Sequence, residues 1–208
     1  MFENIGLTEL LTFAVILLVS ISVHEMMHAF VAHKLGDPTA YEEGRITLNP
    51  LAHIDPVLTV LLPTALVFMG LPPILAAKPV PFRPDLVRGG DWGAALMALA
   101  GPISNFVLAV LGAVVLQVAD VMPGTLAFST IMLFITLNVG LFVFNLIPFP
   151  PLDGSRVLYA FAPEPVRKVM EMIESFGMVA ILLFILLAYQ FISPVISNIV
   201  SSILTFLL

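Results

Sequence analysis

The chain contains no cysteine and few charged residues, and both shortages restrict what it can be. Without thiols, disulfides, thiolate metal sites and cysteine nucleophiles are excluded for its 208 residues. Charged residues make up 11% of the chain, whereas a soluble domain carries about 25%. The 8 basic residues form no run that could bind nucleic acid, so no nucleic-acid partner is expected. Any bound metal must therefore be held by histidine and carboxylate.

Apolar residues form 60% of the chain, against about 45–50% in soluble proteins. A chain of this composition cannot cover its apolar surface by folding in water, which excludes disorder, coiled coils and soluble enzymes. We predict an all-α polytopic membrane protein with about four to six transmembrane helices, surrounded by a lipid bilayer. Residues 1–208 are expected to form a single integral membrane domain.

Several apolar runs reach the roughly 20 residues that a helix needs to cross a bilayer. Residues 165–175 have an amphipathic pattern and are expected to form a helix at the membrane interface. Residues 45–48 alternate between polar and apolar and predict a short strand-like piece. Residues 78–82 contain two prolines, which favours a plain loop over an open strand edge. The expected spans are 10–32, 92–119, 126–147 and 178–208, and the last, interrupted by Pro194, is one kinked span or two short ones.

The first span contains the motif His24-Glu25-Met26-Met27-His28, which is HExxH. Histidines four residues apart share one face of a helix, about 6 Å apart along its axis, so both imidazoles can reach one tetrahedral Zn²⁺. Glu25 then lies beside the open position of the metal, where it can act as general base. The alternative is a polar cluster that only pairs with neighbouring helices. Charged groups in an apolar span cost about 2.5–3.5 kcal/mol each, so they are rarely present without a role.

A catalytic zinc site needs a third protein ligand. His33, His53 and a few acids remain as candidates, with His33 expected at the solvated interface and the role of His53 open. Asp153 stands out because prolines at 148, 150 and 151 end the preceding helix there, and Gly154 lets the backbone turn. A broken helix at membrane depth is tolerated mainly where it lines a cavity or is buried in protein.

Three motifs together resemble the site-2 protease family of intramembrane zinc metalloproteases. They are HExxH at 24–28, Gly101-Pro102-Ile103-Ser104-Asn105 in a later span, and the stretch 145–154 with its Asp-Gly pair. Residues 47–56 and 78–81 are also similar to the small bacterial and archaeal members. The likeness covers roughly residues 8–160, which we expect to be the metal-site core, with an amphipathic helix and an apolar segment at 164–208. A PDZ domain and a nucleotide-binding tail are not expected.

The resemblance implies roles for individual residues around one buried Zn²⁺ per chain. It implies that His24, His28 and Asp153 bind the metal and that Glu25 is catalytic. Asn145 is expected to hold the substrate backbone or the developing oxyanion. For Asn105 the choice is open between helix packing and a hydrogen bond that supports the metal site, whereas Asn138 is more simply a bond to another helix. Gly101 belongs to a stripe of small residues, typical of close helix contact.

A shared metal requires an even number of membrane crossings between His28 and Asp153, and the spans 92–119 and 126–147 supply two. The segment 57–76, broken by Pro63 and by residues 70–73, is therefore predicted to be re-entrant. Basic residues favour the cytoplasmic side. With the N-terminus outside and 57–76 re-entrant, all 8 face the cytoplasm, whereas a crossing would split them six against two at best. The active site is then nearer the cytoplasmic face of the cell membrane.

The resemblance thus implies an intramembrane zinc endopeptidase that hydrolyses a peptide bond in or next to a transmembrane helix of a tethered protein substrate. The biological use that it implies is regulated intramembrane proteolysis. The alternative from another class is a zinc transporter or channel that uses the same ligands as a transit site. An inactive adaptor of the same fold is a third reading. Substrate identity, cleavage site, gating and oligomeric state are not specified by the sequence.

Overall fold

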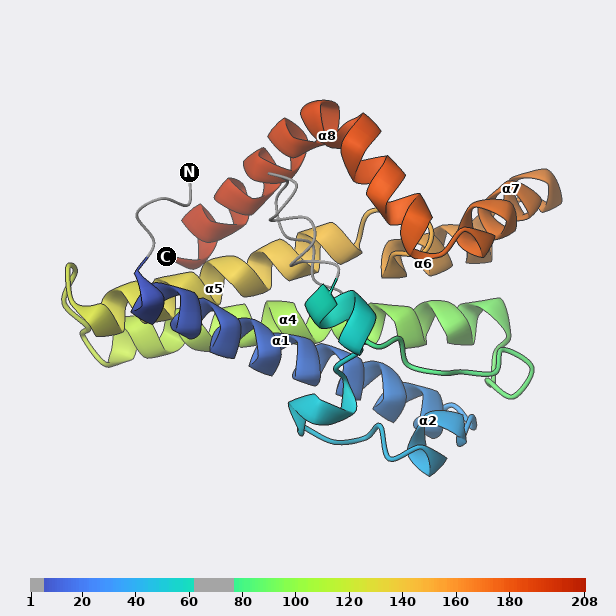
Figure 1. Cartoon of the computed structure of the whole chain (residues 1–208), viewed down its shortest axis with the longest axis horizontal. Coiled ribbons are helices and arrows are strands. Elements are labelled where there is room, and N and C mark those ends of the chain that lie inside the picture. The colour runs from blue at the N-terminus through green and yellow to red at the C-terminus, as the bar shows by residue number, and fades with distance from the viewer. Residues whose placement is uncertain (1–5, 62–76) are drawn as a thin grey trace.

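The computed structural model describes residues 6–61 and 77–208 and is built from helices and connecting loops (Figure 1). No strand occurs within these described ranges. The elements in chain order are α1 (Leu7–Lys34), α2 (Thr39–Glu42), the short helices η1 (Pro50–Ala52) and η2 (Pro56–Leu61), α4 (Asp91–Val118), α5 (Leu126–Asn145), α6 (Asp153–Phe161), α7 (Glu164–Ser175) and α8 (Met178–Leu207).

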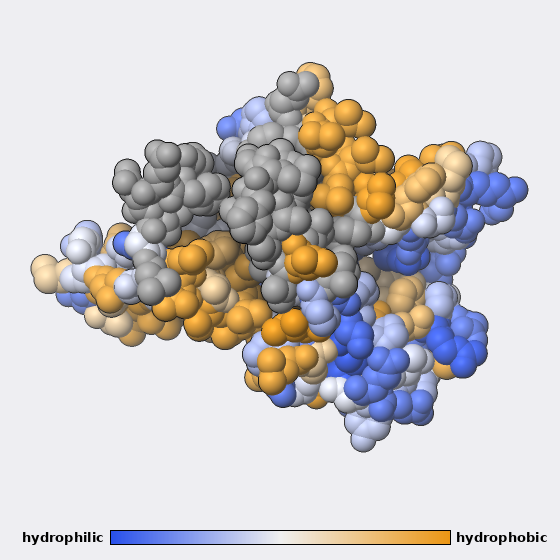
Figure 2. Space-filling view, in the orientation of Figure 1, coloured by the Kyte–Doolittle hydropathy of each residue, from blue (hydrophilic) through white to orange (hydrophobic). Residues whose placement is uncertain are grey.

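Three helices are long and apolar enough to cross a membrane, or up to four if a bent pair counts as one span. They are Thr8–Lys34, Asp91–Val118 and Leu126–Asn145, and the bent pair joins α7 to the start of α8. Apolar side chains also cover much of the outer surface at the left of the molecule, as Figure 2 shows. The prediction of an all-α polytopic membrane protein is confirmed. The three to four candidate spans among the described residues compare with the four to six that were expected.

Helix α4 lies at the centre, packed against α1, α5 and α6 (Figure 1). Small side chains permit this close packing. A Cβ added at Gly112 would lie 2.9 Å from Ile135 Cγ1 of α5, closer than carbon atoms can approach. Ala109 and Ala113 continue the same face and form an apolar core with Ile135 and Val139, which are fully buried. Ala109 and Ala113, which belong to the predicted stripe of small residues, therefore act in helix packing.

The connection between α1 and α4 leaves and returns at one end of the bundle. The Arg88 N–H donates to the Leu35 carbonyl over 2.8 Å, and the Lys78 N–H donates to the His53 carbonyl over 2.8 Å. The predicted re-entrant segment 57–76 lies mostly at 62–76, outside the described residues. The described residues on either side of it, His53 and Lys78, lie next to each other. The chain before it and the chain after it are therefore at the same end of the bundle. This arrangement agrees with the parity argument from the metal ligands.

The prediction of a strand at residues 45–48 is wrong. The side chain of Arg45 bonds the neighbouring segment, where a strand would bond it through backbone groups. Arg45 is buried, and its Nη2 donates to the carbonyls of Lys78, over 2.6 Å, and Pro79, over 2.8 Å. Its Nη1 also donates to the Ala52 carbonyl. One guanidinium thus joins the loop after α2 to the stretch 78–82. That stretch has no regular secondary structure, so the plain-loop prediction is confirmed.

The C-terminal helices close the other side of the bundle. α7 is amphipathic, with Met170 buried and its charged side chains at the polar end of the molecule. α8 contains Pro194 and forms two arms at an angle, so the predicted apolar segment is a bent helix (Figure 1). The side chain of Gln117 donates to the Leu207 carbonyl over 3.1 Å. The C-terminus therefore lies beside the C-terminal end of α4.

Asp37 holds the start of the α1–α4 connection in place. Its Oδ1 accepts from the Thr39 N–H, at 2.9 Å, and from the Thr39 hydroxyl, at 2.6 Å, while Oδ2 accepts from the Arg83 N–H at 2.6 Å. Burial by itself raises the pKa of Asp37, but these bonds favour the ionised form and hold the pKa below its usual value. The carboxylate therefore stabilises the fold above the ordinary aspartate pKa of about 3.9.

We expect Asp37→Asn to lower the free energy of unfolding by about 1–3 kcal/mol at pH 7, because an amide donor would face a backbone donor. In the wild type the contribution of Asp37 falls as the pH drops through its lowered pKa, and the variant lacks this part of the pH dependence. Thermal unfolding in detergent at pH 7 and in steps down to about pH 3 measures both effects. The control Asp85→Asn changes an exposed carboxylate on the same connection. Equal stability of both variants would contradict this role.

Candidate metal centre

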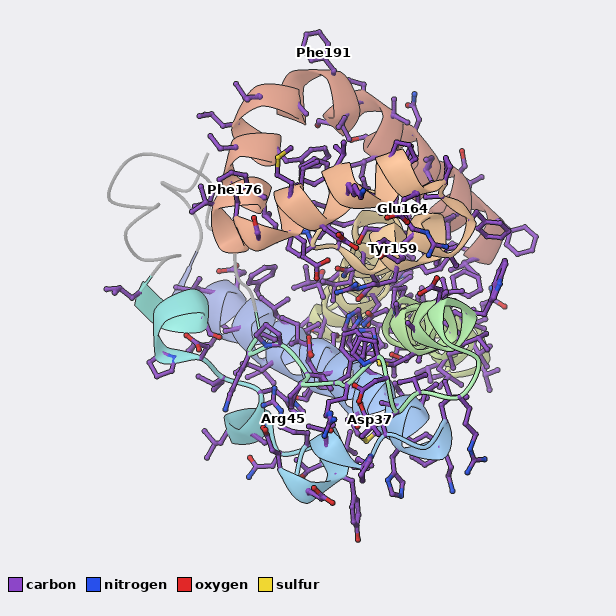
Figure 3. The ribbon with its side chains drawn as sticks, turned by 90° about the vertical axis from the view of Figure 1, so that its right-hand side faces the viewer. Asp37, Arg45, Tyr159, Glu164, Phe176 and Phe191 are labelled. Carbon is purple, nitrogen blue, oxygen red and sulfur yellow. The ribbon has the colours of Figure 1, made fainter. Side chains whose placement is uncertain are left out.

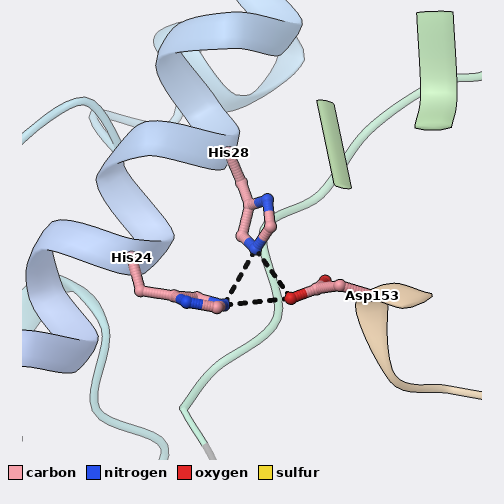
Figure 4. Close-up of side chains that lie close together, drawn as sticks. All are labelled: His24, His28 and Asp153. Carbon is pink, nitrogen blue, oxygen red and sulfur yellow. Dashed lines mark hydrogen bonds and ion pairs between the residues drawn. The ribbon is translucent and has the colours of Figure 1, made fainter. Parts of the chain in front are cut away.

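The two histidines of the HExxH motif lie on one face of α1, as their spacing predicted. Their side chains are nearly buried, with His24 7% and His28 6% exposed. The two Nε2 atoms are 3.0 Å apart and point toward the same place (Figure 4). Helix geometry explains this, because residues four apart are stacked one turn above the other.

Asp153, 125 residues after His28 in the chain, is brought to the same place by the start of α6. Its Oδ2 lies 3.1 Å from His24 Nε2 and 3.4 Å from His28 Nε2 (Figure 4). The chain turns sharply before it, since a Cβ on Gly154 would lie 2.7 Å from the Ile147 carbonyl oxygen and closer still to that of Leu146. Gly154 thus lets the first turn of α6 pack against the end of α5.

The hydrogen bonds of both imidazoles leave Nε2 free to bind a cation. His28 Nδ1 lies 2.9 Å from the Met97 carbonyl, which can only accept, so this nitrogen carries a proton. His24 Nδ1 lies 2.7 Å from the Asn105 side-chain oxygen and is a donor for the same reason. In each neutral ring the lone pair is then on Nε2, the form in which histidine binds a metal.

Three electron-pair donors therefore meet at one point. His24, His28 and Asp153 form a group of potential metal ligands whose ligand atoms all lie within 4.8 Å of one another. Asp153 Oδ2 is buried and has no hydrogen-bond partner among the described residues. Tetrahedral zinc with bonds of roughly 2.0–2.1 Å separates its ligands by about 3.4 Å. The observed separations of 3.0–3.4 Å are close to this value, so the donor set suits such an ion.

Gly101 lies directly against the ligand atoms. A Cβ at this position would lie 2.6 Å from His24 Nε2 and closer still to His28 Nε2. The sequence placed Gly101 in the packing stripe and in the motif 101–105, one turn before Asn105. The structure adds that any side chain here would occupy the space between the two histidines. The Met97 carbonyl, which orients His28, was not identified from the sequence because a backbone atom leaves no residue-type signal.

The other predicted site residues are not members of this group of three ligands. Glu25 is half-buried on the neighbouring face of α1. Asn145 is half-buried at the end of α5, and its amide donates to the Leu141 carbonyl over 2.9 Å. His33 stacks on the Tyr41 ring, with centroids 4.6 Å apart. His53 is buried and its Nε2 donates to the Thr47 carbonyl over 2.9 Å.

The polar end of the molecule, seen in Figure 3, has a cavity of about 250 Å³ between side chains of α4, α6 and α7. In that view Tyr159 and Glu164 lie on the α7 side, and Asp37 and Arg45 lie on the α1 side. Ion pairs bridge the helices here, with Arg167 to Asp91 at 2.6 Å and Arg156 to Glu174. The cavity is lined by Phe82, Pro84, Asp91, Ala94, Arg156, Tyr159 and Glu171.

The chain is similar to a known protein family and to several known proteins. A family model described as Peptidase family M50 matches residues 119–188. The Bacillus subtilis strain 168 protein named "Putative zinc metalloprotease YwhC" is 40% identical over 173 residues, which cover 80% of this chain and 76% of that protein. No solved structure matches the chain significantly.

Two mycobacterial proteins share the name "Putative zinc metalloprotease Rip2". The one from Mycolicibacterium smegmatis is 30% identical over 175 residues, and the one from Mycobacterium tuberculosis H37Rv is 28% identical over 172 residues. Each alignment covers 81% of this chain and 64% of the relative. The similarity to the Bacillus protein spans most of both chains. The chain belongs to Peptidase family M50, the site-2 protease family that its motifs resemble.

Proposed function

We propose that residues 1–208 act as one integral membrane protease domain, a zinc-dependent endopeptidase that cleaves in or next to a transmembrane helix of a tethered protein. The observation that carries this proposal is the convergence of His24, His28 and Asp153 between apolar helices, with Glu25 on the adjacent helix face. The names of the relatives, which describe zinc metalloproteases, support the choice of metal and of reaction. Release of a membrane-bound regulator after an earlier cut is the biological use that we propose.

In this proposal His24, His28 and Asp153 hold the metal and Glu25 moves the proton. A zinc ion held by these three residues would lower the pKa of a bound water to about 7 and would polarise a carbonyl oxygen. The Glu25 carboxylate accepts the proton of the attacking water and delivers it to the leaving amine. The substrate helix must first unwind locally, because its carbonyls are otherwise occupied by backbone hydrogen bonds.

Asn145 is proposed to hold the substrate backbone or the oxyanion. A carboxamide has two donor hydrogens and an acceptor oxygen, and in Asn145 one donor is used by the Leu141 carbonyl. Its second donor hydrogen and its oxygen have no hydrogen-bond partner in the described part of the chain and could bond an extended peptide. Asn145 ends α5 and stands eight residues before Asp153, on the same broken segment that brings the carboxylate to the site.

Zinc transport is the alternative function, and the distribution of ligands disfavours it. A transit path needs further ligands along both halves of the membrane, whereas His24, His28 and Asp153 are the group that emerges from the described residues. Glu9, in the first turn of α1, is the acid nearest the opposite end of that helix. Proteolysis needs one fixed site and a general base, which the three ligands and Glu25 can supply.

We further propose that the N-terminus faces outward and that the site opens toward the cytoplasm. The basic side chains lie at the end of α1, in the loop from α1 to α4, and in α6 and α7. These elements form the hydrophilic end of the molecule, which is blue in Figure 2. The turn between α4 and α5 lies at the opposite end and carries no base. Basic residues are enriched on the cytoplasmic side of membrane proteins. The residues of this group are Lys34, Arg45, Lys78, Arg83, Arg88, Arg156, Arg167 and Lys168.

The general base is tested by Glu25→Gln. We expect the variant to retain zinc and to cleave a co-expressed single-span substrate about 10²–10⁴-fold more slowly, because the amide cannot accept the proton. Immunoblotting of the cleaved substrate and elemental analysis of the purified protein measure the two effects. Glu42→Gln, which changes an exposed carboxylate, serves as control. Cleavage by Glu25→Gln at the wild-type rate would exclude this carboxylate as the base.

The third ligand is tested by Asp153→Ala. Removing a carboxylate oxygen that lies 3.1 Å from His24 Nε2 should leave two ligands and lower the bound zinc well below the wild-type level. Elemental analysis after dialysis against a weak chelator gives the stoichiometry, and thermal unfolding shows that the variant is folded. Asp85→Ala, at an exposed site, should bind as much zinc as the wild type. Unchanged zinc in Asp153→Ala would remove Asp153 from the ligand set.

The orientation is tested with single cysteines, which is straightforward because the natural chain has none. Met122→Cys, in the exposed α4–α5 turn, should react with a membrane-impermeant maleimide on intact cells. Glu43→Cys, in the exposed loop after α2, should react only after the membrane is permeabilised. The reverse pattern would show that the site opens outward.

A further inference from the structure

We propose that Asn138 is a positioning residue that acts through Asn105 to fix which nitrogen of His24 carries the proton. The inference rests on the proposed zinc site and assigns a role to a side chain that touches none of the three ligands. Three helices contribute, namely α1 through Ser20 and His24, α4 through Asn105 and α5 through Asn138. Their polar groups form one hydrogen-bonded chain in which all donors point the same way.

The donor and acceptor roles in this series of hydrogen bonds are fixed first at Asn138, whose side chain is fully buried. Its Nδ2 donates to the Phe134 carbonyl over 2.9 Å and to the Ser20 hydroxyl oxygen over 2.9 Å. A backbone carbonyl can only accept, so this bond fixes which end of the carboxamide is nitrogen. The Asn138 oxygen must therefore be the atom that faces Asn105.

Asn105 is the next residue in this series of hydrogen bonds, and its side chain is also fully buried. Its Nδ2 donates to Asn138 Oδ1 over 2.9 Å and to the Ser20 carbonyl over 3.3 Å. Both partners are acceptors, so the Asn105 oxygen faces His24 Nδ1 at 2.7 Å. That imidazole nitrogen must donate, which leaves the lone pair of the neutral ring on Nε2, 3.1 Å from Asp153 Oδ2.

Asn138 is needed because the longer bond of Asn105 to Ser20 holds its carboxamide less firmly. Without the Asn138 oxygen, only the 3.3 Å bond to the Ser20 carbonyl would oppose rotation of the Asn105 amide, so a donor would face His24 in a larger fraction of molecules. His24 would then place its proton on Nε2, the nitrogen that faces His28 and Asp153. Binding a metal would first require this proton to move, and the apparent affinity for zinc would fall.

A residue that only packed two helices together would behave differently. Its replacement would lower the stability of the protein but leave the neutral form of His24 and the zinc affinity of the folded protein unchanged. The two roles are separable with substitutions at Asn138 and with Val139→Ala as control. Val139 is the next residue of α5 and is fully buried in the apolar core, so its truncation leaves a cavity without affecting a hydrogen bond.

The experiment uses the purified full-length protein in detergent, stripped of metal and titrated with zinc against a chelator of known affinity. Asn138→Leu, which is similar in size but has no polar atom, should weaken zinc binding by about 10–100-fold. Asn138→Asp should bind zinc as the wild type does, because its carboxyl oxygen still accepts from Asn105. Val139→Ala should lower the melting temperature without weakening zinc binding. Asn138→Leu with wild-type zinc affinity would overturn the proposal.

A second measurement does not depend on any variant folding. In the zinc-free wild type, ¹⁵N NMR of the histidine rings at a pH where they are neutral should place the His24 proton on Nδ1. A proton on Nε2 would overturn the proposal even if zinc binds. Failure of the proposed function would look different, since the wild type would then bind no zinc and cleave no substrate while His24 kept its proton on Nδ1.

Discussion

Two imidazole nitrogens and one carboxylate oxygen meet within 3.0–3.4 Å of one another among apolar helices, and the packing of α1 and α6 against α4 holds them there. In the neutral rings all three atoms present electron pairs, so their approach is unfavourable without a shared positive charge. A divalent ion would convert this repulsion into the strongest interaction in the bundle. Several otherwise unrelated features, including the glycine at 101 and the turn at 154, bring the three atoms together.

Helix α4 is the element through which these features are coupled. It provides the Met97 carbonyl and the Asn105 carboxamide that orient the two histidines, and it has no side chain at Gly101, where the ligand atoms lie. Its first turn is tied to α7 by the ion pair of Asp91 with Arg167. Since α4 packs against α1, α5 and α6, a shift of this helix would move the metal ligands relative to one another. It would also change the cavity that Asp91 and Ala94 of α4 help to line.

The sequence predicted those features that depend on local spacing. HExxH places two histidines on one helix face whatever surrounds them, and the prolines before Asp153 mark a break in the helix at any depth. Residues 45–48 were wrongly predicted to be a strand. Alternation of polar and apolar residues cannot show that the Arg45 side chain bonds the backbone carbonyls of residues 78 and 79. The contacts of Gly101 and Asn138 depend on how α1, α4 and α5 are aligned with one another. No pattern within a single helix specifies that alignment.

X-ray absorption spectroscopy at the zinc edge of the purified wild-type protein shows whether this chain binds zinc through two histidines and a carboxylate. We expect a shell of nitrogen and oxygen ligands at about 2.0–2.1 Å, with the outer-shell scattering of two imidazole rings. A protein without stoichiometric zinc, or a spectrum with one imidazole or none, would contradict it.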